Sequence, residues 1–316
     1  MQAPRTRVQR RPVHGVLLLD KPLGLSSNNA LQKAKWLLRA EKAGHTGTLD
    51  PLATGVLPIC FGAATKFSQL HLDADKTYET TVCLGVRTST ADAEGEVIAT
   101  RPVNCTLGQV VEVLDRFMGP IRQVPPMHSA LKKDGKALYE YAREGETVER
   151  EPRDVVIHEL ELLEVQLQGD APFLRLHVKC SKGTYIRTLG EDIGEALGCG
   201  GHLVALRRIA TGPFDQTQCV TLEGLETLDE TERPKQLKPV DTLLPGHASV
   251  TLDSENAGRF LSGLRRRGNW PDTEQVAVYG SQPHALLGTA HVKAGELIPG
   301  RLLSPIEIRQ ILESQP

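Results

Sequence analysis

The most informative stretch of the chain is Gly44-His-Thr-Gly-Thr-Leu-Asp50-Pro-Leu-Ala-Thr-Gly-Val-Leu-Pro58. It contains one carboxylate, one imidazole, three hydroxyls and three glycines, but no lysine, arginine, cysteine or aromatic ring. The glycines allow backbone angles that other residues avoid, so the stretch is expected to form a shaped loop. Pro51 favours an extended backbone at Asp50. An acid on a rigid loop suits a nucleophile or a general base. Turn aspartates are far more common, however, and on local chemistry alone a turn role for Asp50 is favoured.

The composition is that of an ordinary globular chain. Its 316 residues suggest about two domains, with 40% hydrophobic and 24% charged residues. No apolar run is long enough to span a bilayer, and no signal-peptide apolar segment follows the basic N-terminus. The six cysteines lie about twenty or more residues apart, which argues against a zinc knuckle and a disulfide framework. We therefore expect a cytoplasmic protein that has no membrane association and no metal site.

Positive charge is concentrated near the N-terminus. The chain has a formal charge of −2, yet residues 1–50 carry nine Lys or Arg against three acids, a local charge of +6. A basic patch attracts phosphates whatever the total charge, because screening confines the interaction to nearby groups. A basic tail followed by a solvated helix face explains the same pattern. Charge alone leaves both interpretations open.

Hydrophobic periodicity predicts a mixture of strands and helices, and hence an α+β fold. Short apolar or alternating runs predict strands over residues 15–19, 78–86, 160–167 and 174–180. Helical spacing predicts helices over residues 29–40, 107–118 and 186–197. Ser26 or Ser27 is expected to cap the first helix, and Thr106 with Gln109 to form a capping box on the second.

Two further regions have a distinct character. Residues 132–153 are polar and carry many charges of both signs, which predicts a surface excursion. Pro245-Gly246 is typical of a linker. The last 66 or so residues contain short alternating segments and several glycines, which predicts a small β-rich domain.

Several familiar site types are excluded by the residues present. Gly44–Thr48 lacks the lysine of a phosphate-binding P-loop. A retaining glycosidase needs a second acid beside Asp50, and no sequence feature nominates one. The sequence therefore predicts chemistry without a nucleotide or metal cofactor.

An ordered set of further motifs extends from residue 15 to residue 210. Around the stretch 44–58 the chain contains Asp20-Lys-Pro-Leu-Gly-Leu-Ser-Ser27, Ala64-Thr-Lys66, Lys76-Thr-Tyr78, Leu84-Gly-Val-Arg-Thr88, Asp92-Ala-Glu-Gly95, Pro125-Pro-Met-His-Ser-Ala-Leu-Lys132, Cys180-Ser-Lys-Gly-Thr-Tyr-Ile-Arg187 and Gly201-His-Leu-Val-Ala-Leu-Arg-Arg208. Together these motifs resemble the bacterial tRNA pseudouridine-55 synthase (TruB) family. Two departures are minor: His128 stands where a tyrosine is usual, and Asn29 where an aspartate is common.

The resemblance implies a fold, a reaction and a substrate. The implied fold is a pseudouridine synthase catalytic domain with a central mixed or antiparallel sheet over residues 15–246. A basic tail, 1–14, precedes it, and a small PUA-like RNA-binding domain, 250–316, follows it. The implied reaction converts uridine 55 in the T-loop of tRNA into pseudouridine. It uses no cofactor, and the enzyme acts as a monomer that requires no protein partner.

The resemblance also reverses the interpretation of Asp50, which becomes the catalytic nucleophile. Whether it attacks the ribose C1′, attacks the uracil ring or helps to form a glycal is open at the level of sequence. Arg187 resembles the arginine that pairs with this aspartate in a charge-assisted contact, for which a bidentate geometry is available to the guanidinium. From sequence alone its alternative is a helix-surface arginine. His45 is suited to fill the stack that a flipped uridine vacates, and its alternative is a hydrogen-bonded core histidine.

The remaining candidates form a pocket for the uracil. Tyr78 resembles the family tyrosine that packs on the flipped base and acts as a base, where the alternative is an ordinary strand aromatic. Tyr185 and Leu206 resemble residues that line the pocket. Lys21 is expected to support the loop or contact phosphate. Arg265, Arg266 and Arg267 are expected either to touch the acceptor arm through phosphates or to form a solvated turn.

Two other functions compete with this interpretation. A non-enzymatic RNA-binding protein or tRNA-folding chaperone would explain the basic N-terminus, but binding alone does not need the set Asp50, Tyr78 and Arg187. Both activities can coexist, because forcing a T-loop open also helps a misfolded tRNA to refold. A different structured RNA, as in eukaryotic and archaeal relatives that use guide RNAs, is disfavoured by the compact bacterial-style C-terminus.

Overall fold

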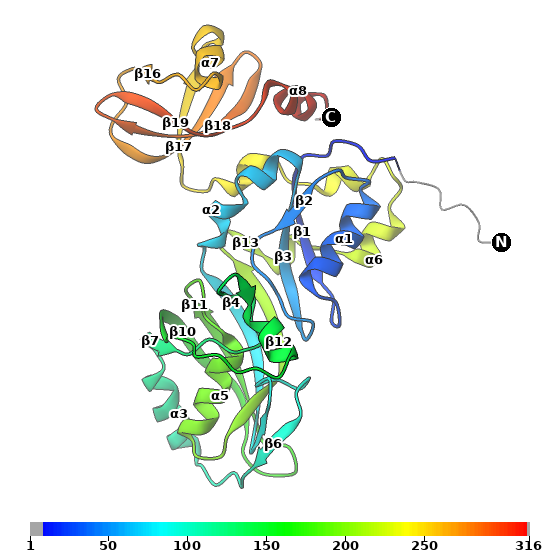
Figure 1. The fold of residues 1–316 in the computed structure, drawn as a ribbon, viewed down its shortest axis with the longest axis vertical. Helices are drawn as coiled ribbons and strands as arrows, with labels where there is room; N and C mark the ends of the chain where they lie inside the picture. The colour runs from blue at the N-terminus through cyan, green and yellow to red at the C-terminus, as the bar shows by residue number, and fades with distance from the viewer. Residues whose placement is uncertain (1–8, 315–316) are drawn as a thin grey trace, which may run out of the picture.

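The computed structural model describes residues 9–314, which form an elongated molecule built on two large β-sheets (Figure 1). Among these residues the larger sheet has ten strands and the other, at one end of the molecule, has five. The first eight residues of the predicted basic tail lie outside the described part of the chain. No helix within residues 9–314 is long and apolar enough to cross a membrane.

The larger sheet is mixed, which is one of the two forms that the family resemblance implied. Eight of its strands follow one path, in the order β14 (Val220–Thr221), β1 (Gly15–Lys21), β3 (Ala53–Phe61), β12 (Gly201–Thr211), β4 (Lys76–Leu84), β11 (Phe173–Cys180), β10 (Arg153–Gln166) and β7 (Gly119–Gln123). Two short strands, β2 (Ala43–His45) and β13 (Phe214–Asp215), pair with β3 and β12. The pairs β1–β14 and β3–β12 are parallel and the other pairs are antiparallel. The predicted central mixed sheet is therefore confirmed.

Helices cover one face of this sheet. Near one end α1 (Ser27–Leu37) lies beside α6 (Leu222–Thr227), and near the other α3 (Leu107–Arg116) lies beside α5 (Ile186–Ala196) (Figure 1). Their apolar sides enter a single core with the odd-numbered residues of β1, such as Leu17 and Leu19. The even-numbered Val16 and Leu18 face the opposite way, into a second core. The two-residue period of a strand thus divides β1 between two cores.

Shorter elements connect these layers. They are α2 (Ser68–Leu72), α4 (Leu138–Arg143), the two hairpins β5 (Val86–Thr88)–β6 (Val97–Thr100) and β8 (Lys132–Lys133)–β9 (Lys136–Ala137), and the 3₁₀ turns at Gly62–Lys66, Gln216–Gln218, Arg233–Gln236 and Val240–Leu243. The hairpin β8–β9 and α4 occupy the charged region that the sequence predicted to be a surface excursion. Most of the side chains in this region are exposed or half-buried, which agrees with that prediction.

Most predicted elements are present, with shifted ends. The first helix begins two residues earlier and ends three residues earlier than expected, because Leu38 closes it and Arg39 has a φ of 51°. Ser26, rather than Ser27, is its cap, and the capping box of α3 is present. Strand β10 begins seven residues before the expected position. Its first residues, such as Arg153 and Asp154, are exposed and charged, so apolar periodicity could not find them.

The five-stranded sheet packs against the first part of the molecule. Its order is β15 (Ala248–Leu252), β17 (Thr273–Ser281), β18 (His284–Lys293), β19 (Glu296–Leu302) and β16 (Arg266–Arg267), and it is accompanied by α7 (Ser254–Leu261) and α8 (Pro305–Ser314). Ala277 and Leu303 join the second core of the larger sheet. Lys66 donates to the Leu302 carbonyl at 2.9 Å and pairs with Glu307 at 2.7 Å. The predicted β-rich C-terminal region is confirmed.

The stretch 44–58 is only partly a loop. Strand β2 ends at His45 and β3 begins at Ala53, so the irregular part is residues 46–52, called the Asp50 loop below. Of the three glycines, Gly47 and Gly55 have positive φ values of 85° and 100°, whereas Gly44 does not. A Cβ atom at Gly55 would lie 2.1 Å from the Arg208 carbonyl oxygen of the neighbouring strand, so no side chain fits there.

The two glycines give a matched test of this packing. We expect Gly55→Ala to lower the free energy of unfolding by about 2–4 kcal/mol, since both its backbone angle and its close approach to β12 are lost. Gly44→Ala has no atom within 4 Å of the new Cβ, and we expect it to be neutral or stabilising by up to about 1 kcal/mol. Urea unfolding of both variants measures the difference. Equal losses of unfolding free energy in the two variants would contradict the conclusion that no side chain fits at Gly55.

Candidate active site

Asp50 lies within the short Asp50 loop, whose backbone is fixed at several points. The Asp50 carbonyl accepts from the Ala53 N–H at 3.1 Å, so the loop closes on the first residue of β3. The carbonyl of Pro51 accepts from the Gly24 N–H at 2.9 Å, which ties the loop to the turn after β1. The side chain of Asp50 is 38% exposed and faces the N-terminus of α5.

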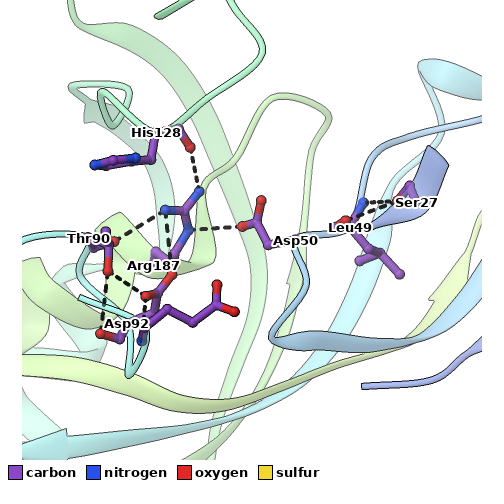
Figure 2. Close-up of polar contacts among 8 residues, drawn as sticks. Ser27, Leu49, Asp50, Thr90, Asp92, His128 and Arg187 are labelled. Carbon is purple, nitrogen blue, oxygen red and sulfur yellow. Dashed lines mark hydrogen bonds and ion pairs between the residues drawn. The ribbon is translucent and has the colours of Figure 1, made fainter. Parts of the chain in front are cut away.

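Arg187, in the first turn of α5, is the centre of a buried polar junction (Figure 2). Its Nε lies 2.9 Å from Asp50 Oδ2, and its Nη1 lies 3.6 Å from Asp92 Oδ2. Nη1 also donates to the Thr90 carbonyl at 3.2 Å, and Nη2 donates to the His128 carbonyl at 2.7 Å. The Arg187 side chain is only 6% exposed, so the helix-surface alternative is wrong. The contact with Asp50 is made by Nε alone and not by two parallel bonds.

The junction places one positive charge between two carboxylates. Burial raises the pKa of Asp50 above its ordinary value, and the nearby Asp92 carboxylate adds to the rise. The Arg187 guanidinium opposes both effects through its charge and its hydrogen bond, and so favours the ionised form. Asp92 is itself anchored, because its Oδ1 accepts from the Thr90 hydroxyl and, at 3.0 Å, from the Glu94 N–H.

All six site residues nominated from the sequence line one cavity of about 620 Å³. They come from β2, the Asp50 loop, β4, the turn before α5, α5 itself and β12, and are His45, Asp50, Tyr78, Tyr185, Arg187 and Leu206. The structure therefore brings these six residues together. A second cavity of similar size adjoins the first and shares Asp50 and Arg187 with it, so the carboxylate is accessible from two sides.

The two tyrosines that line the cavity are fixed in place by neighbouring residues. Tyr78 on β4 pairs in register with Arg208 on β12, next to Leu206 on the same face. Burial raises the pKa of the Tyr78 hydroxyl, and the Arg208 charge acts against this rise. The backbone of Tyr185 is fixed by the side chain of Gln123, which accepts from its N–H at 3.1 Å and donates to its carbonyl at 3.3 Å.

The surroundings of His45 favour the uncharged form of its imidazole. Burial lowers its pKa below the ordinary value, and the Arg208 charge lowers it further. Its buried Nδ1 has no hydrogen-bond partner among the described residues. The hydrogen-bonded core histidine that the sequence offered as an alternative is therefore not what the structure contains.

Arg208 is a structural residue of the site to which the sequence analysis gave no role. It is 1% exposed, and its Nε donates to the Val56 carbonyl at 2.7 Å while Nη2 donates to the Gly47 carbonyl at 3.2 Å. It therefore ties β12 to β3 and to the Asp50 loop. Its position two residues after Leu206, on the same strand face, was the available signal.

Lys21 supports the turn after β1 and is withdrawn from the surface. It is fully buried, and its ammonium donates to the carbonyls of Pro22 at 2.9 Å and Leu25 at 2.5 Å. Burial lowers its pKa to about 8, although the nearby Asp50 charge acts against this fall. Of the two expected roles, loop support is the one that the structure contains.

Part of the positive charge counted over residues 1–50 is neutralised by acids from elsewhere in the chain. Lys33 pairs with Glu226 at 2.6 Å and Arg39 with Glu230 at 2.9 Å, so both are locally neutralised. Residues 1–8, which carry two of the arginines, lie outside the described part of the chain. Residues 9–314 contain no group of three or more His, Cys, Asp or Glu side chains able to hold a metal ion, and the expectation of metal-free chemistry stays a prediction.

Comparisons with known proteins agree with this architecture. The structure titled "Crystal Structure of a Cbf5-Nop10-Gar1 Complex" matches with a TM-score of 0.68 at 25% identity, over 93% of this chain and 86% of that one. The structure titled "Structure of H/ACA RNP bound to a substrate RNA containing 2'-deoxyuridine" shares the fold with a TM-score of 0.67, at 23% identity over 92% and 86% of the two chains. Three family models cover the sequence: TruB family pseudouridylate synthase (N terminal domain) at 35–186, tRNA pseudouridylate synthase B C-terminal domain at 187–245, and Pseudouridine synthase II TruB, C-terminal at 248–303.

Curated relatives are more similar still. The tRNA pseudouridine synthase B of Verminephrobacter eiseniae (strain EF01-2) is 64% identical over 317 residues, covering 99% of this chain and 96% of that protein. The tRNA pseudouridine synthase B of Ralstonia pickettii (strain 12J) is 59% identical over 312 residues, covering 96% and 98% of the two chains. The fold and the family models thus define a pseudouridine synthase. Within that class, the chain belongs to the TruB family.

Removing the central cation tests the charge balance of the site. We expect Arg187→Met to lower the free energy of unfolding by about 2–4 kcal/mol at pH 7, because it leaves two facing carboxylates without their counter-ion. The pKa of Asp50 then rises further in the folded state, so the folded variant takes up protons more readily than the unfolded chain. Its deficit therefore shrinks as the pH falls towards about 4. Urea unfolding across this range measures the trend.

Arg187→Lys is the control for this experiment. It keeps a positive charge but loses the planar group that reaches four acceptors, so we expect a smaller and less pH-dependent loss. A deficit of Arg187→Met that stays constant between pH 4 and pH 7 would show that packing, and not charge, is what the arginine supplies.

Proposed function

We propose that this enzyme converts uridine 55 in the T-loop of tRNA into pseudouridine, as a monomer and without a cofactor, with Asp50 as the nucleophile. The main observation behind the proposal is that all six residues nominated from the sequence line one cavity. The names of the curated relatives, tRNA pseudouridine synthase B, support tRNA as the substrate. The family resemblance supports position 55.

The proposed binding mode begins with a flipped base. A uridine stacked in a folded loop must leave its stack to reach Asp50, at a cost of roughly a few kcal/mol. Tyr78 and Leu206 come from the adjacent strands β4 and β12, and together with Tyr185 they form the apolar walls of the uracil pocket. His45 offers a flat ring, whose uncharged form burial favours, and this ring stacks in the space the base leaves, which offsets part of the cost.

The chemical step needs an ionised and directed carboxylate. In the overall reaction the C1′–N1 bond breaks, a C1′–C5 bond forms, C5 loses its proton and N1 gains one. Attack at C1′, attack at the uracil ring and formation of a glycal all start from the Asp50 carboxylate, which Arg187 favours. We assign removal of the C5 proton to Tyr78, although burial raises the pKa of its hydroxyl and the Arg208 charge only acts against this rise.

We assign different tasks to the two ends of the chain. Residues 15–246 carry the catalytic domain, and residues 250–316 form a PUA-like domain that contacts the acceptor arm. Arg265 and Arg267 both pair with one acid, Glu296, at 3.3 and 3.0 Å, so this exposed edge retains positive charge for phosphates. The tRNA assignment is favoured over a guide-RNA complex because the tRNA enzymes are 59–64% identical to this chain and the Cbf5 complex is 25% identical.

Replacing the nucleophile tests the proposal directly. We expect Asp50→Asn to abolish pseudouridine formation, a loss of at least about 10³-fold, while binding of a T-arm stem-loop changes little. Because C5 loses its hydrogen, tritium release from [5-³H]uridine in the stem-loop measures turnover. Retained turnover would remove Asp50 from the chemistry. If the chain also assists tRNA folding, the same variant should keep that activity in a refolding assay.

Salt dependence tests the nature of the substrate. We expect affinity for tRNA to fall by about 10-fold or more between 50 and 200 mM salt, since phosphate contacts release counter-ions. A filter-binding series measures the slope. An affinity that does not respond to salt would contradict a phosphate-based footprint. Sequencing pseudouridine positions in total RNA with and without the gene then tests whether position 55 is the target.

A further inference from the structure

The side chain of Ser27 makes two hydrogen bonds to one residue of the Asp50 loop (Figure 2). Its Oγ accepts from the Leu49 N–H at 2.7 Å and donates to the Leu49 carbonyl at 3.0 Å. Ser27 is 1% exposed and Leu49 is 4% exposed, so water does not compete for either bond. Such a reciprocal pair is directional, because moving either group breaks both bonds at once.

Capping of α1 does not account for this contact. The cap is the neighbouring Ser26, whose side chain accepts from the Asn29 N–H at 3.1 Å. Ser27 is the first helical residue, and its hydroxyl points away from the helix end, towards the loop. The helix therefore has its own cap, and the second serine of the motif Asp20–Ser27 is free for another task.

The task follows from the position of Leu49 in the chain. Its N–H belongs to the peptide that precedes it, and its carbonyl belongs to the peptide that carries the nitrogen of Asp50. Two bonds to one hydroxyl therefore fix both backbone dihedrals of Leu49 and the orientation from which the Asp50 side chain leaves the backbone. On the other side of Asp50, the Gly24–Pro51 hydrogen bond of 2.9 Å holds the next peptide.

We propose that Ser27 is a positioning residue that aims the Asp50 carboxylate at the reacting nucleotide by clamping the backbone of Leu49. The proposal rests on the proposed role of Asp50 as nucleophile. It gives the Asp20–Ser27 motif a function in the reaction. The turn after β1 holds the loop on both sides of the carboxylate, through Gly24 at Pro51 and through Ser27 at Leu49.

Single-turnover kinetics of Ser27→Ala on a T-arm stem-loop test this inference. We expect the rate at saturating enzyme to fall by about 10- to 100-fold, the range that a small misplacement of a reacting group produces. We expect the dissociation constant for the stem-loop to change by less than about 2-fold, because Ser27 lines the second cavity but is only 1% exposed and offers almost no surface to a substrate. A rate within about 2-fold of the native enzyme, or an equal loss of rate and affinity, would overturn the proposal.

The pH profile distinguishes aiming from general stability. A looser loop weakens the contact between Asp50 and Arg187, which otherwise keeps the pKa of Asp50 from rising further. We therefore expect the acidic limb of the rate profile of Ser27→Ala to move to higher pH. An acidic limb that stays in place, together with a uniformly lower rate, would overturn the proposal as well.

Thr106→Ala is the matched control. Thr106 caps α3 through the Gln109 N–H at 3.3 Å and lines neither cavity, so this variant loses a hydroxyl–backbone bond away from Asp50. We expect its thermal midpoint to fall by about 2–4 °C with the rate unchanged. If Ser27→Ala does not fold, Ser27→Cys carries the test, because a thiol of similar size is only a weak donor and acceptor. A native rate in Ser27→Cys would then overturn the proposal.

Failure of this inference and failure of the proposed function give different results. If Asp50→Asn is inactive and Ser27→Ala has the native rate, only the clamp is wrong. If Asp50→Asn is active, the nucleophile assignment is wrong, and the proposed role of Ser27 in aiming Asp50 falls with it. Both variants are measured with the same assay, so one experiment distinguishes the two outcomes.

Discussion

The buried guanidinium of Arg187 is the interaction on which the rest of the site depends. A charge with 6% exposure is tolerated only if its N–H groups are bonded and its charge is balanced. Its acceptors come from three distant parts of the sequence, the Asp50 loop, the Thr90–Asp92 turn and the segment at His128. None of these parts has a regular strand or helix to fix it there. The arginine that they share joins them to one another, while other contacts, such as the Gly24–Pro51 hydrogen bond and the Asp92–Leu203 β-bridge, tie the parts to the rest of the fold.

The opposite wall of the cavity is built on a different principle. Tyr78, Leu206 and Arg208 belong to the neighbouring strands β4 and β12, so the register of the sheet fixes their spacing. The alternation of side chains along each strand delivers them to one face, and Arg208 adds hydrogen bonds to β3 and to the Asp50 loop. The cavity thus combines a rigid sheet, suited to bind a base, with loops that depend on a few polar contacts to orient the carboxylate.

This division explains what the sequence could and could not predict. The mixed sheet, the helices and the six cavity residues were expected, because periodicity and the quoted motifs lie within single segments. The burial of Lys21, the role of Arg208 and the single-bond contact of Arg187 were not, because each depends on segments far apart in sequence. The turn interpretation of Asp50 also had a partial basis, since its carbonyl does close a tight turn onto Ala53. Local chemistry could not tell that the side chain faces Arg187.

Strand β1 connects the site to the far end of the molecule. Its odd-numbered residues, Leu17 and Leu19, pack in the core beneath α1, and its even-numbered residues, Val16 and Leu18, pack in the core shared with Ala277 of the C-terminal sheet. At its end, the strand leads directly into the turn whose Gly24 and Ser27 hold the Asp50 loop. Because well-packed cores transmit displacement instead of absorbing it, a shift of the C-terminal sheet would reach this turn through one strand. The C-terminal sheet therefore shares a core with the strand that leads to the Asp50 loop, although none of its residues lines the cavity.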